Sequence, residues 1–388
     1  MIIKYTLITF SLLGLLACAN FPEKFENIIE EGKIRPIAIV LDPPEAAPGD
    51  TVNVTLYMHD AGKPYSIDWT LALDFNITNY GQLGSSGSVL NLDSMRIDAD
   101  GYMDNPLRFR FVVPVGDKNP MLHSSLIPEI AIPSSELDND MKGALESMDV
   151  PIGEKGVAGK DVVELLDNTE DIPEEFSPMV DGLISLIVLN ARVVSGDFTL
   201  DIEKKLTVRY SNRLVVENGT TNVNVNPTLD SIGIISVAKK DMEIPEDIHK
   251  YDSDTVYFKT NAFNQDSGAV VDTFVIKKDY SYFLIADSAG AAQKYVTPNG
   301  TVLKEQLFYH WYYTNLDETS SDWEKLINIG SDESDASLSV VSMTPPTDKS
   351  MNNFRIRVSV SDWRPEWALL CSDGIGYLDV RGYFKYED

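Results

Sequence analysis

The sequence contains only two cysteines in 388 residues, Cys18 and Cys371, and four histidines. Two cysteines allow at most one disulfide, so the fold cannot depend on a disulfide framework. The histidines are scattered, with no pair at metal-ligand spacing and no cysteine partner, which argues against a zinc centre. The four histidines are His59, His123, His249 and His310. We expect each of them to lie at the surface or to be hydrogen-bonded in the core.

Positive charge is also scarce, because 32 Lys and Arg stand against 60 Asp and Glu and leave a net charge of −28. A chain this acidic is repelled by nucleic-acid phosphates and by anionic lipid headgroups. We therefore expect no nucleic-acid partner, whereas cationic partners or divalent ions fit better. The plainest interpretation of the charge is a solvated acidic surface.

Long apolar runs are missing as well. A membrane-spanning helix needs about 20 apolar residues, and the run from Tyr5 to Leu16 has about a dozen. A second run, from Leu183 to Val194, is interrupted by polar residues. The first run follows a single cation, Lys4, and ends at a small residue, Ala17, which is typical of a secretory signal peptide.

Cys18 directly follows Leu15-Leu16-Ala17, and this segment resembles the signal of a bacterial lipoprotein. The resemblance implies that residues 1–17 are removed, that the sulfur of Cys18 is lipidated, and that the chain reaches the membrane through this anchor. Two or three acyl chains anchor a protein stably in the bilayer, since each buried methylene contributes about 0.8 kcal/mol to membrane binding. Ala19 resembles an outer-membrane sorting signal. An ordinary cleaved signal and a retained anchor are the alternatives.

Residues 18–33 then form a polar tether, with Pro22 and mixed charges, between the lipid and the folded chain. Lipidation of Cys18 also leaves Cys371 alone, so no intramolecular disulfide can form. We expect Cys371 to be a buried small apolar residue, with a reactive thiol as the lesser alternative.

Short alternating segments between Pro and Gly turns dominate residues 34–221. Val52, Val54 and Leu56 alternate with polar residues, a period of two that is typical of a half-buried strand. Residues 67–75 and 108–113 repeat this pattern. The segments predict an antiparallel sandwich of the immunoglobulin type.

Residues 115–180 differ in character and predict a helical, acidic insertion into this sandwich. Four apolar residues at helical spacing should share one face of a first helix: Leu137, Met141, Leu145 and Met148. A second short helix is expected over 160–166, followed by an acidic loop at 167–175.

A joint is expected at 222–227, which ends in Asn226-Pro227. Residues 222–388 then return to alternating apolar and polar positions, and we predict a second immunoglobulin-like module. Its clearest strands are expected over 255–259, 270–277, 307–314 and 354–360. The fold class is therefore mainly β, with two antiparallel β-sandwich modules.

Four segments carry a family resemblance: Pro48-Gly49-Asp50-Thr51-Val52, Asn226-Pro227-Thr228-Leu229, Trp311-Tyr312-Tyr313-Thr314, and Phe354 to Val360 followed by Asp362. Together they resemble bacterial lipoproteins with immunoglobulin-like modules that occur in myxobacteria and their relatives. Related sequences often have a Gly-rich turn after the last long strand, where this chain has Ser361-Asp362-Trp363-Arg364-Pro365 instead. No activity is established for that family, so the resemblance implies no functional residues.

Two acidic segments could hold calcium. Asp98, Asp100 and Asp104 stand in an oxygen-rich loop, and a hard divalent ion needs six to eight oxygens. The loop lacks the Gly and the terminal acid of the helical calcium motif, so a solvated loop is the alternative. The segment 331–335 is similar and fits a solvated loop better. Calcium is the only cofactor the sequence suggests.

An aromatic strand offers the second candidate site. Tyr309, Trp311 and Tyr313 alternate with His310 and Tyr312, so three rings share one face of the strand. An exposed face of this kind would be a platform for a sugar ring or a protein partner. Core packing is the alternative, and exposure decides between the two.

These patterns together predict a non-enzymatic lipoprotein of the bacterial cell envelope, anchored in the outer membrane, with a binding or structural role. Its partner would be an envelope protein or a glycan. A polysaccharide hydrolase is the rival hypothesis, because carboxylate pairs leave no sequence pattern. A calcium-stabilised adhesin is the third.

Overall fold

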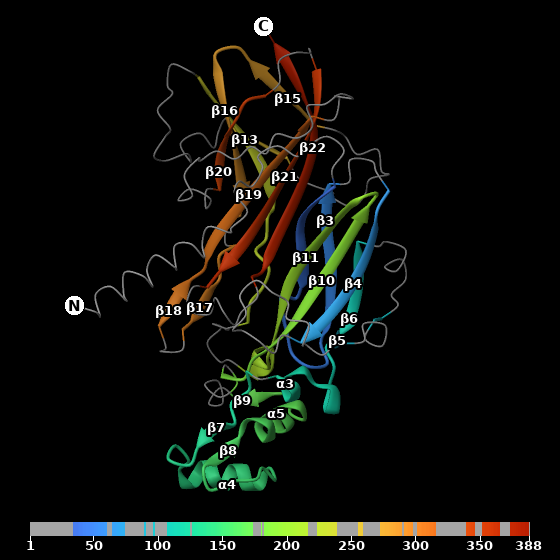
Figure 1. Cartoon of the computed structure of the whole chain (residues 1–388). Coiled ribbons are helices and arrows are strands. Elements are labelled where there is room, and N and C mark those ends of the chain that lie inside the picture. Colours follow the sequence, from blue (N-terminus) through green and yellow to red (C-terminus); the bar gives the residue numbers. More distant parts are fainter. Residues whose placement is uncertain are drawn as a thin grey trace, which may run out of the picture.

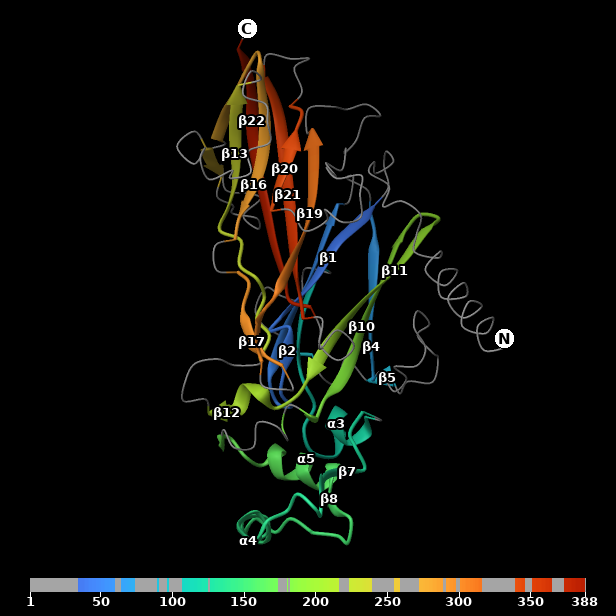
Figure 2. The same cartoon turned by 90° about the vertical axis from the view of Figure 1, so that its left-hand side faces the viewer.

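The computed structural model describes residues 34–59, 64–73, 89–90, 96–97, 107–124, 126–173, 180, 182–215, 223–238, 255–258, 272–288, 291–297, 301–315, 339–345, 351–364 and 373–387. Across these ranges, no helix is long and apolar enough to cross a membrane. The molecule is elongated, with one module at each side of a central junction and a small helical part at one end (Figures 1 and 2).

The first module is a β-sandwich of two sheets. One sheet has the order β1-β3-β6, with β1 (Arg35–Asp42), β3 (Thr51–His59) and β6 (Arg108–Val112). The facing sheet has the order β2-β11-β10-β4-β5, with β2 (Glu45–Ala46), β11 (Phe198–Val208), β10 (Ser185–Ser195), β4 (Ser66–Leu73) and β5 (Val89–Leu90).

Alternation of side chains places the core between these sheets. Val52 and Val54 of β3 are fully buried and lie opposite Phe111 and Phe109 of β6 in the strand register. On the other sheet, Leu71 and Leu73 of β4 enter the same core, with the ring of Trp69 half-buried against Phe109 at 4.9 Å between centroids. Because successive strand residues face opposite sides, the alternating pattern of β3 and β6 predicts which of their residues enter this core.

The helical part is inserted between β6 and β10. Its described elements are η2 (Gly116–Lys118), α3 (Pro120–His123), β7 (Ile130–Pro133), α4 (Asn139–Ser147), β8 (Gly156–Ala158), α5 (Gly159–Asp167) and β9 (Ile172–Pro173). After β11, the chain returns to this part with the 3-10 turn η4 (Ser211–Arg213) and the short strand β12 (Leu214–Val215), which pairs in parallel with β9. Tyr210 connects the insertion to the sandwich, since its hydroxyl accepts a hydrogen bond from Asn119 Nδ2 at 2.9 Å and donates to Asp167 at 3.1 Å.

One expectation for the insertion needs correction. The helix over 160–166 is present as α5, and Leu137 and Leu145 are buried as expected. Met141 and Met148 are exposed by 38% and 41%, so the four residues do not share one buried face. The nine-residue helix α4 lies at the tip of the molecule (Figure 1), and among its described side chains only that of Leu145 is buried.

The second module is also a two-sheet sandwich. Its sheets have the orders β14-β13-β16-β20 and β15-β22-β21-β19, and a hairpin, β17-β18, lies beside them. The strands are β13 (Ser231–Ala238), β14 (Thr255–Phe258), β15 (Asp272–Lys277), β16 (Tyr280–Asp287), β17 (Lys294–Val296), β18 (Val302–Lys304), β19 (Gln306–Asn315), β20 (Val340–Met343), β21 (Met351–Trp363) and β22 (Ile375–Glu387).

Both modules follow one topology. In each, the last two long strands form an antiparallel hairpin, and a short early strand pairs in parallel with the last one: β2 with β11, and β15 with β22. The strand that pairs with the first strand of this hairpin carries a tryptophan: Trp69 in β4, which pairs with β10, and Trp311 in β19, which pairs with β21. Strands C, F and G of the immunoglobulin fold have this order, with a Trp on C.

The prediction of a mainly β fold with two immunoglobulin-like sandwiches is therefore confirmed. Each module has its own apolar core, one around Val54, Phe109 and Leu189 and the other around Trp311, Phe354 and Phe384. Residues 223–230 link the two modules and contain neither helix nor strand.

Candidate functional site

The junction between the modules begins with close backbone packing of the linker against β22. Asn226 donates from Nδ2 to the carbonyl oxygen of Leu41 at 2.7 Å, and its Oδ1 accepts from the N–H of Ile375 at 2.9 Å. A Cβ on Gly376 would lie 2.1 Å from the carbonyl oxygen of Pro227. Glycine is therefore required there for the start of β22 to lie against the linker.

A buried ion pair belongs to the first module. Arg209, which follows β11, contacts Glu45 of β2 through both Nε and Nη2, the latter at 2.7 Å. The two side chains are 1% and 2% exposed. Glu45 Oε2 also accepts from the backbone N–H of Asn224 at 3.1 Å, so the pair extends to the linker.

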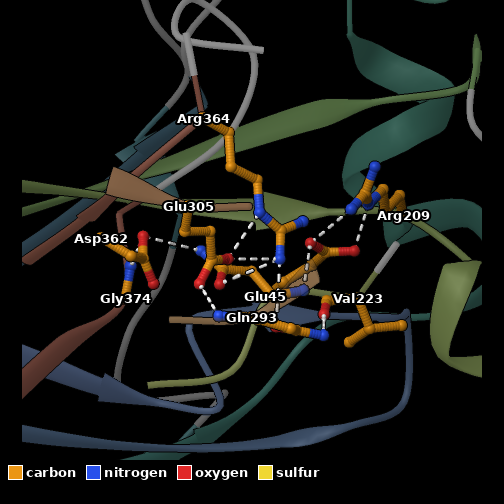
Figure 3. A network of polar contacts seen from close by, with 9 residues as sticks. Glu45, Arg209, Val223, Gln293, Glu305, Asp362, Arg364 and Gly374 are labelled. Carbon is orange, nitrogen blue, oxygen red and sulfur yellow. Dashed lines mark hydrogen bonds and ion pairs between the residues drawn. The ribbon is translucent and has the colours of Figure 1, made fainter. Parts of the chain in front are cut away.

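A second buried ion pair belongs to the second module. Arg364, which follows β21, donates from Nε to Oε1 of Glu305 at 2.7 Å, and their side chains are 2% and 0% exposed. Arg364 also donates to Gln293 Oε1 at 3.1 Å and lies over the ring of Tyr295. Gln293 in turn donates from Nε2 to the carbonyl oxygen of Val223 at 2.9 Å, so this pair also reaches the linker (Figure 3).

Asp362 lies between the linker and the start of β22. Its Oδ1 accepts from Asn224 Nδ2 at 3.2 Å and from the N–H of Gly374 at 2.8 Å. The residue is 1% exposed, and its Oδ2 has no hydrogen-bond partner in the part of the chain that the structure describes. Burial, reinforced by the nearby charge of Glu305, raises the pKa of Asp362 to about 7.

A shallow cavity of about 240 Å³ opens next to Asp362. It is lined by Phe308, Ser361, Asp362, Trp363 and Asp373, and the rings of Phe308 and Trp363 meet edge to face at 5.8 Å. Lys204 of the first module donates to the carbonyl oxygen of Asp373 at 2.7 Å. Desolvation raises the pKa of Asp373 and lowers that of Lys204, and the attraction between them opposes both shifts.

A ring contact adds to the junction away from the buried charges. Tyr57 of β3 stacks on Tyr377 of β22 with 3.8 Å between ring centroids. Burial is the main cause that raises the pKa of Tyr377, so its hydroxyl stays neutral. The modules are thus joined by an apolar stack as well as by polar bonds.

The residues of the predicted aromatic platform lie in the second module, in its core. Tyr309 and Trp311 are 8% and 3% exposed, and Tyr313 is half-buried against Phe384. Tyr312, on the opposite face of β19, is also buried. A platform needs exposed rings, so these residues form core instead, and the platform prediction is corrected on that ground.

The other predicted site residues lie outside the described ranges. They are Cys18 for lipidation, Asp98, Asp100 and Asp104 for calcium, and Cys371. Among the residues that the structure does describe, no group of three His, Cys, Asp or Glu could hold a metal ion.

The fold and the site together define a two-module immunoglobulin-like protein whose modules are docked through buried charges. No protein-family model matches the chain, and no curated protein matches it. Among solved structures, the chain is similar to the N-terminal eight immunoglobulin domains of Down syndrome cell adhesion molecule isoform 1.30.30, at 8% sequence identity and a TM-score of 0.17. The match covers 92% of this chain and 25% of the other, so the chain spans about a quarter of the length of that structure. A likeness this weak assigns no function.

Proposed function

We propose that the protein is a lipid-anchored scaffold of the bacterial cell envelope that presents a binding surface and carries out no chemistry of its own. The docked junction is the observation that supports this role best. Buried bonds from both modules converge on Asn224 of the linker, which contacts Glu45 and Asp362. A junction of this kind holds two modules in one orientation, as a display or binding scaffold requires.

The position of the insertion fits this proposal. It lies at the end of the molecule farthest from the second module (Figures 1 and 2). A scaffold anchored at one point can present such a projecting part to an envelope protein or a glycan. The immunoglobulin-like fold is widely used for binding, although fold alone does not determine function.

The anchoring half of the proposal has a direct test. Cells that express the protein would be labelled with a tagged fatty acid, with a Cys18→Ser variant as the matched control. We expect label on the wild-type protein only, and a longer precursor when lipoprotein signal cleavage is blocked with globomycin. Wild-type protein that carries no label and keeps its size under globomycin would contradict the anchor.

A polysaccharide hydrolase is the second candidate, and the cavity at the junction is the observation that favours it. Asp362 and Asp373 both line it, both have raised pKa values, and two aromatic rings lie beside them. Against this, Asp362 is 1% exposed and both bonds to its Oδ1 are structural. Release of reducing sugar by the wild type, abolished in Asp373→Asn, would establish the hydrolase and overturn the scaffold proposal.

A further inference from the structure

The buried charges at the junction do not balance. Glu45, Glu305 and Asp362 are three buried carboxyl groups, whereas Arg209 and Arg364 are two buried guanidinium groups. Each arginine makes its short ion pair with a glutamate. Both hydrogen bonds to the carboxyl group of Asp362 within the described residues come from uncharged N–H groups. When Asp362 is ionised, the junction therefore holds one surplus buried negative charge, which is unfavourable in a poorly solvated site.

The charged and polar groups around Asp362 come from both modules and from the linker. Glu305, just before β19, disfavours the charged form, whereas Arg364 after β21 favours it. The N–H groups of Asn224 and Gly374 also favour the charged form, but burial and Glu305 outweigh these contributions. From the first module, Lys204 of β11 is attracted to Asp362 and to Asp373. Desolvation lowers the pKa of Lys204, and its hydrogen bond goes to the carbonyl oxygen of Asp373 and not to the carboxyl group of Asp362.

We propose that Asp362 is a proton-controlled latch for the docking of the two modules: the junction closes fully on the neutral carboxyl and loosens when that group ionises. Loosening lets water reach the carboxylate and removes the penalty of a buried charge. The movement would reach both modules, because Asn224 bonds to Asp362 through its side chain and to Glu45 through its backbone N–H. This property does not depend on the lipid anchor.

The direction of the pH effect follows from linkage. The pKa of Asp362 is about 7 in the closed junction and close to the ordinary 3.8 in an open, hydrated one. A group whose pKa is raised by closing holds its proton in the closed state, so closing is favoured at low pH and loses that advantage as the pH rises from about 4 to about 7. With these two values the opening equilibrium rises about 90-fold between pH 5 and pH 8 and is nearly constant above pH 8.

Amide hydrogen exchange of the whole mature chain can test the latch. The backbone N–H groups of Asn224 and Ile375 bridge the linker to the two modules, so their protection reports on docking. After correction for intrinsic exchange rates, we expect protection to fall between pH 5 and pH 8 by up to about 90-fold. The N–H of Val358, in the middle of β21, should keep its protection, since it lies in the core of the second module.

Two variants separate the latch from a general effect of pH. Asp362→Asn keeps the shape and the Oδ1 acceptor of the side chain but cannot ionise. In this variant we expect the protection of the Asn224 N–H to change less than threefold between pH 5 and pH 8. Asp230→Asn removes an exposed carboxylate from the same linker and should retain the full wild-type response. The proposal is overturned if the protection of these amides in the wild type does not change between pH 5 and pH 8, or if it falls in Asp362→Asn as much as in the wild type.

If Asp362→Asn does not fold, a carboxyl ¹³C titration of the wild-type protein decides instead. A midpoint for Asp362 near 7 supports the latch. A midpoint near 4 overturns it, because a group with an ordinary pKa cannot couple docking to pH in this range.

Discussion

Replacing Arg364 with Met should destabilise the second module strongly. Arg364 is 3% exposed, donates to Glu305, Gln293 and Asn224, and lies over the Tyr295 ring. Methionine fills much of the same space but leaves the buried carboxylate of Glu305 without its cation. Breaking a buried pair in this way costs about 3–5 kcal/mol, because the remaining charge stays desolvated.

The exposed pair of Arg192 and Asp201 provides a matched control. Its closest atoms are 3.8 Å apart, and the two side chains are 60% and 57% exposed. Solvent screens such a pair, so Arg192→Met should cost less than about 1 kcal/mol. A second comparison is Glu305→Gln combined with Arg364→Met, which removes both charges but keeps an acceptor for the N–H of Gln293. We expect this double variant to regain most of the lost stability, because Glu305 no longer leaves a buried carboxylate without its cation.

Urea unfolding followed by tryptophan fluorescence measures these differences. With a slope of about 2 kcal/mol per molar urea, the loss in Arg364→Met corresponds to a midpoint roughly 2 M lower for the second module. The reasoning is refuted if Arg364→Met costs no more than Arg192→Met. It is also refuted if removing both charges costs more than removing Arg364 alone.

Two further predictions concern the packing of the chain. Gly376→Ala should destabilise the protein by about 1–3 kcal/mol, because its Cβ would lie 2.1 Å from the carbonyl oxygen of Pro227 and the backbone must shift. Gly143→Ala has no atom within 4 Å of the added Cβ and lies in α4, so it should raise stability by about 1 kcal/mol, and urea unfolding measures both changes. For the stack of Tyr57 on Tyr377, a double-mutant cycle with leucine should give a coupling of about 0.5–1.5 kcal/mol, and a value near zero would show that the rings do not hold the modules together.

Much of the fold could be predicted because the alternation of apolar and polar residues in the sequence indicates which face of a strand is buried. Val52, Val54 and Leu56 alternate with polar residues, and all three are buried in β3. Phe109 and Phe111 follow the same rule in β6. A period of two needs no knowledge of distant contacts, so sequence alone was sufficient for these elements.

Exposure was harder to predict where more than one face is covered. Alternation put Tyr309 and Trp311 on one face of β19 but could not say that Tyr312 on the other face would be buried as well. The exposed Met141 and Met148 are the reverse case, since helical spacing predicts a shared face but not a neighbour to cover it.

The junction could not be predicted. Glu45 and Arg209 are 164 residues apart in the chain, and Asn224 and Asp362 are 138 apart. With 60 acidic residues in the sequence, nothing local marks Glu45, Glu305 and Asp362 as the ones that are buried at the junction. In the sequence, Asp362 stands out only by its place after a long strand, and nothing marks the paired glutamates and arginines. Such pairs are defined by the docking of modules, which sequence periodicity does not describe.

The central claim is that the buried junction holds the two modules as one rigid body, and ¹⁵N relaxation of the mature chain tests it most directly. At pH 5, where the carboxyl of Asp362 is neutral and the junction is closed, amides of β10 in the first module and of β21 in the second should report one common rotational correlation time, that of the whole molecule. Two different and shorter correlation times, one for each module, would mean that the modules tumble independently and would contradict the account.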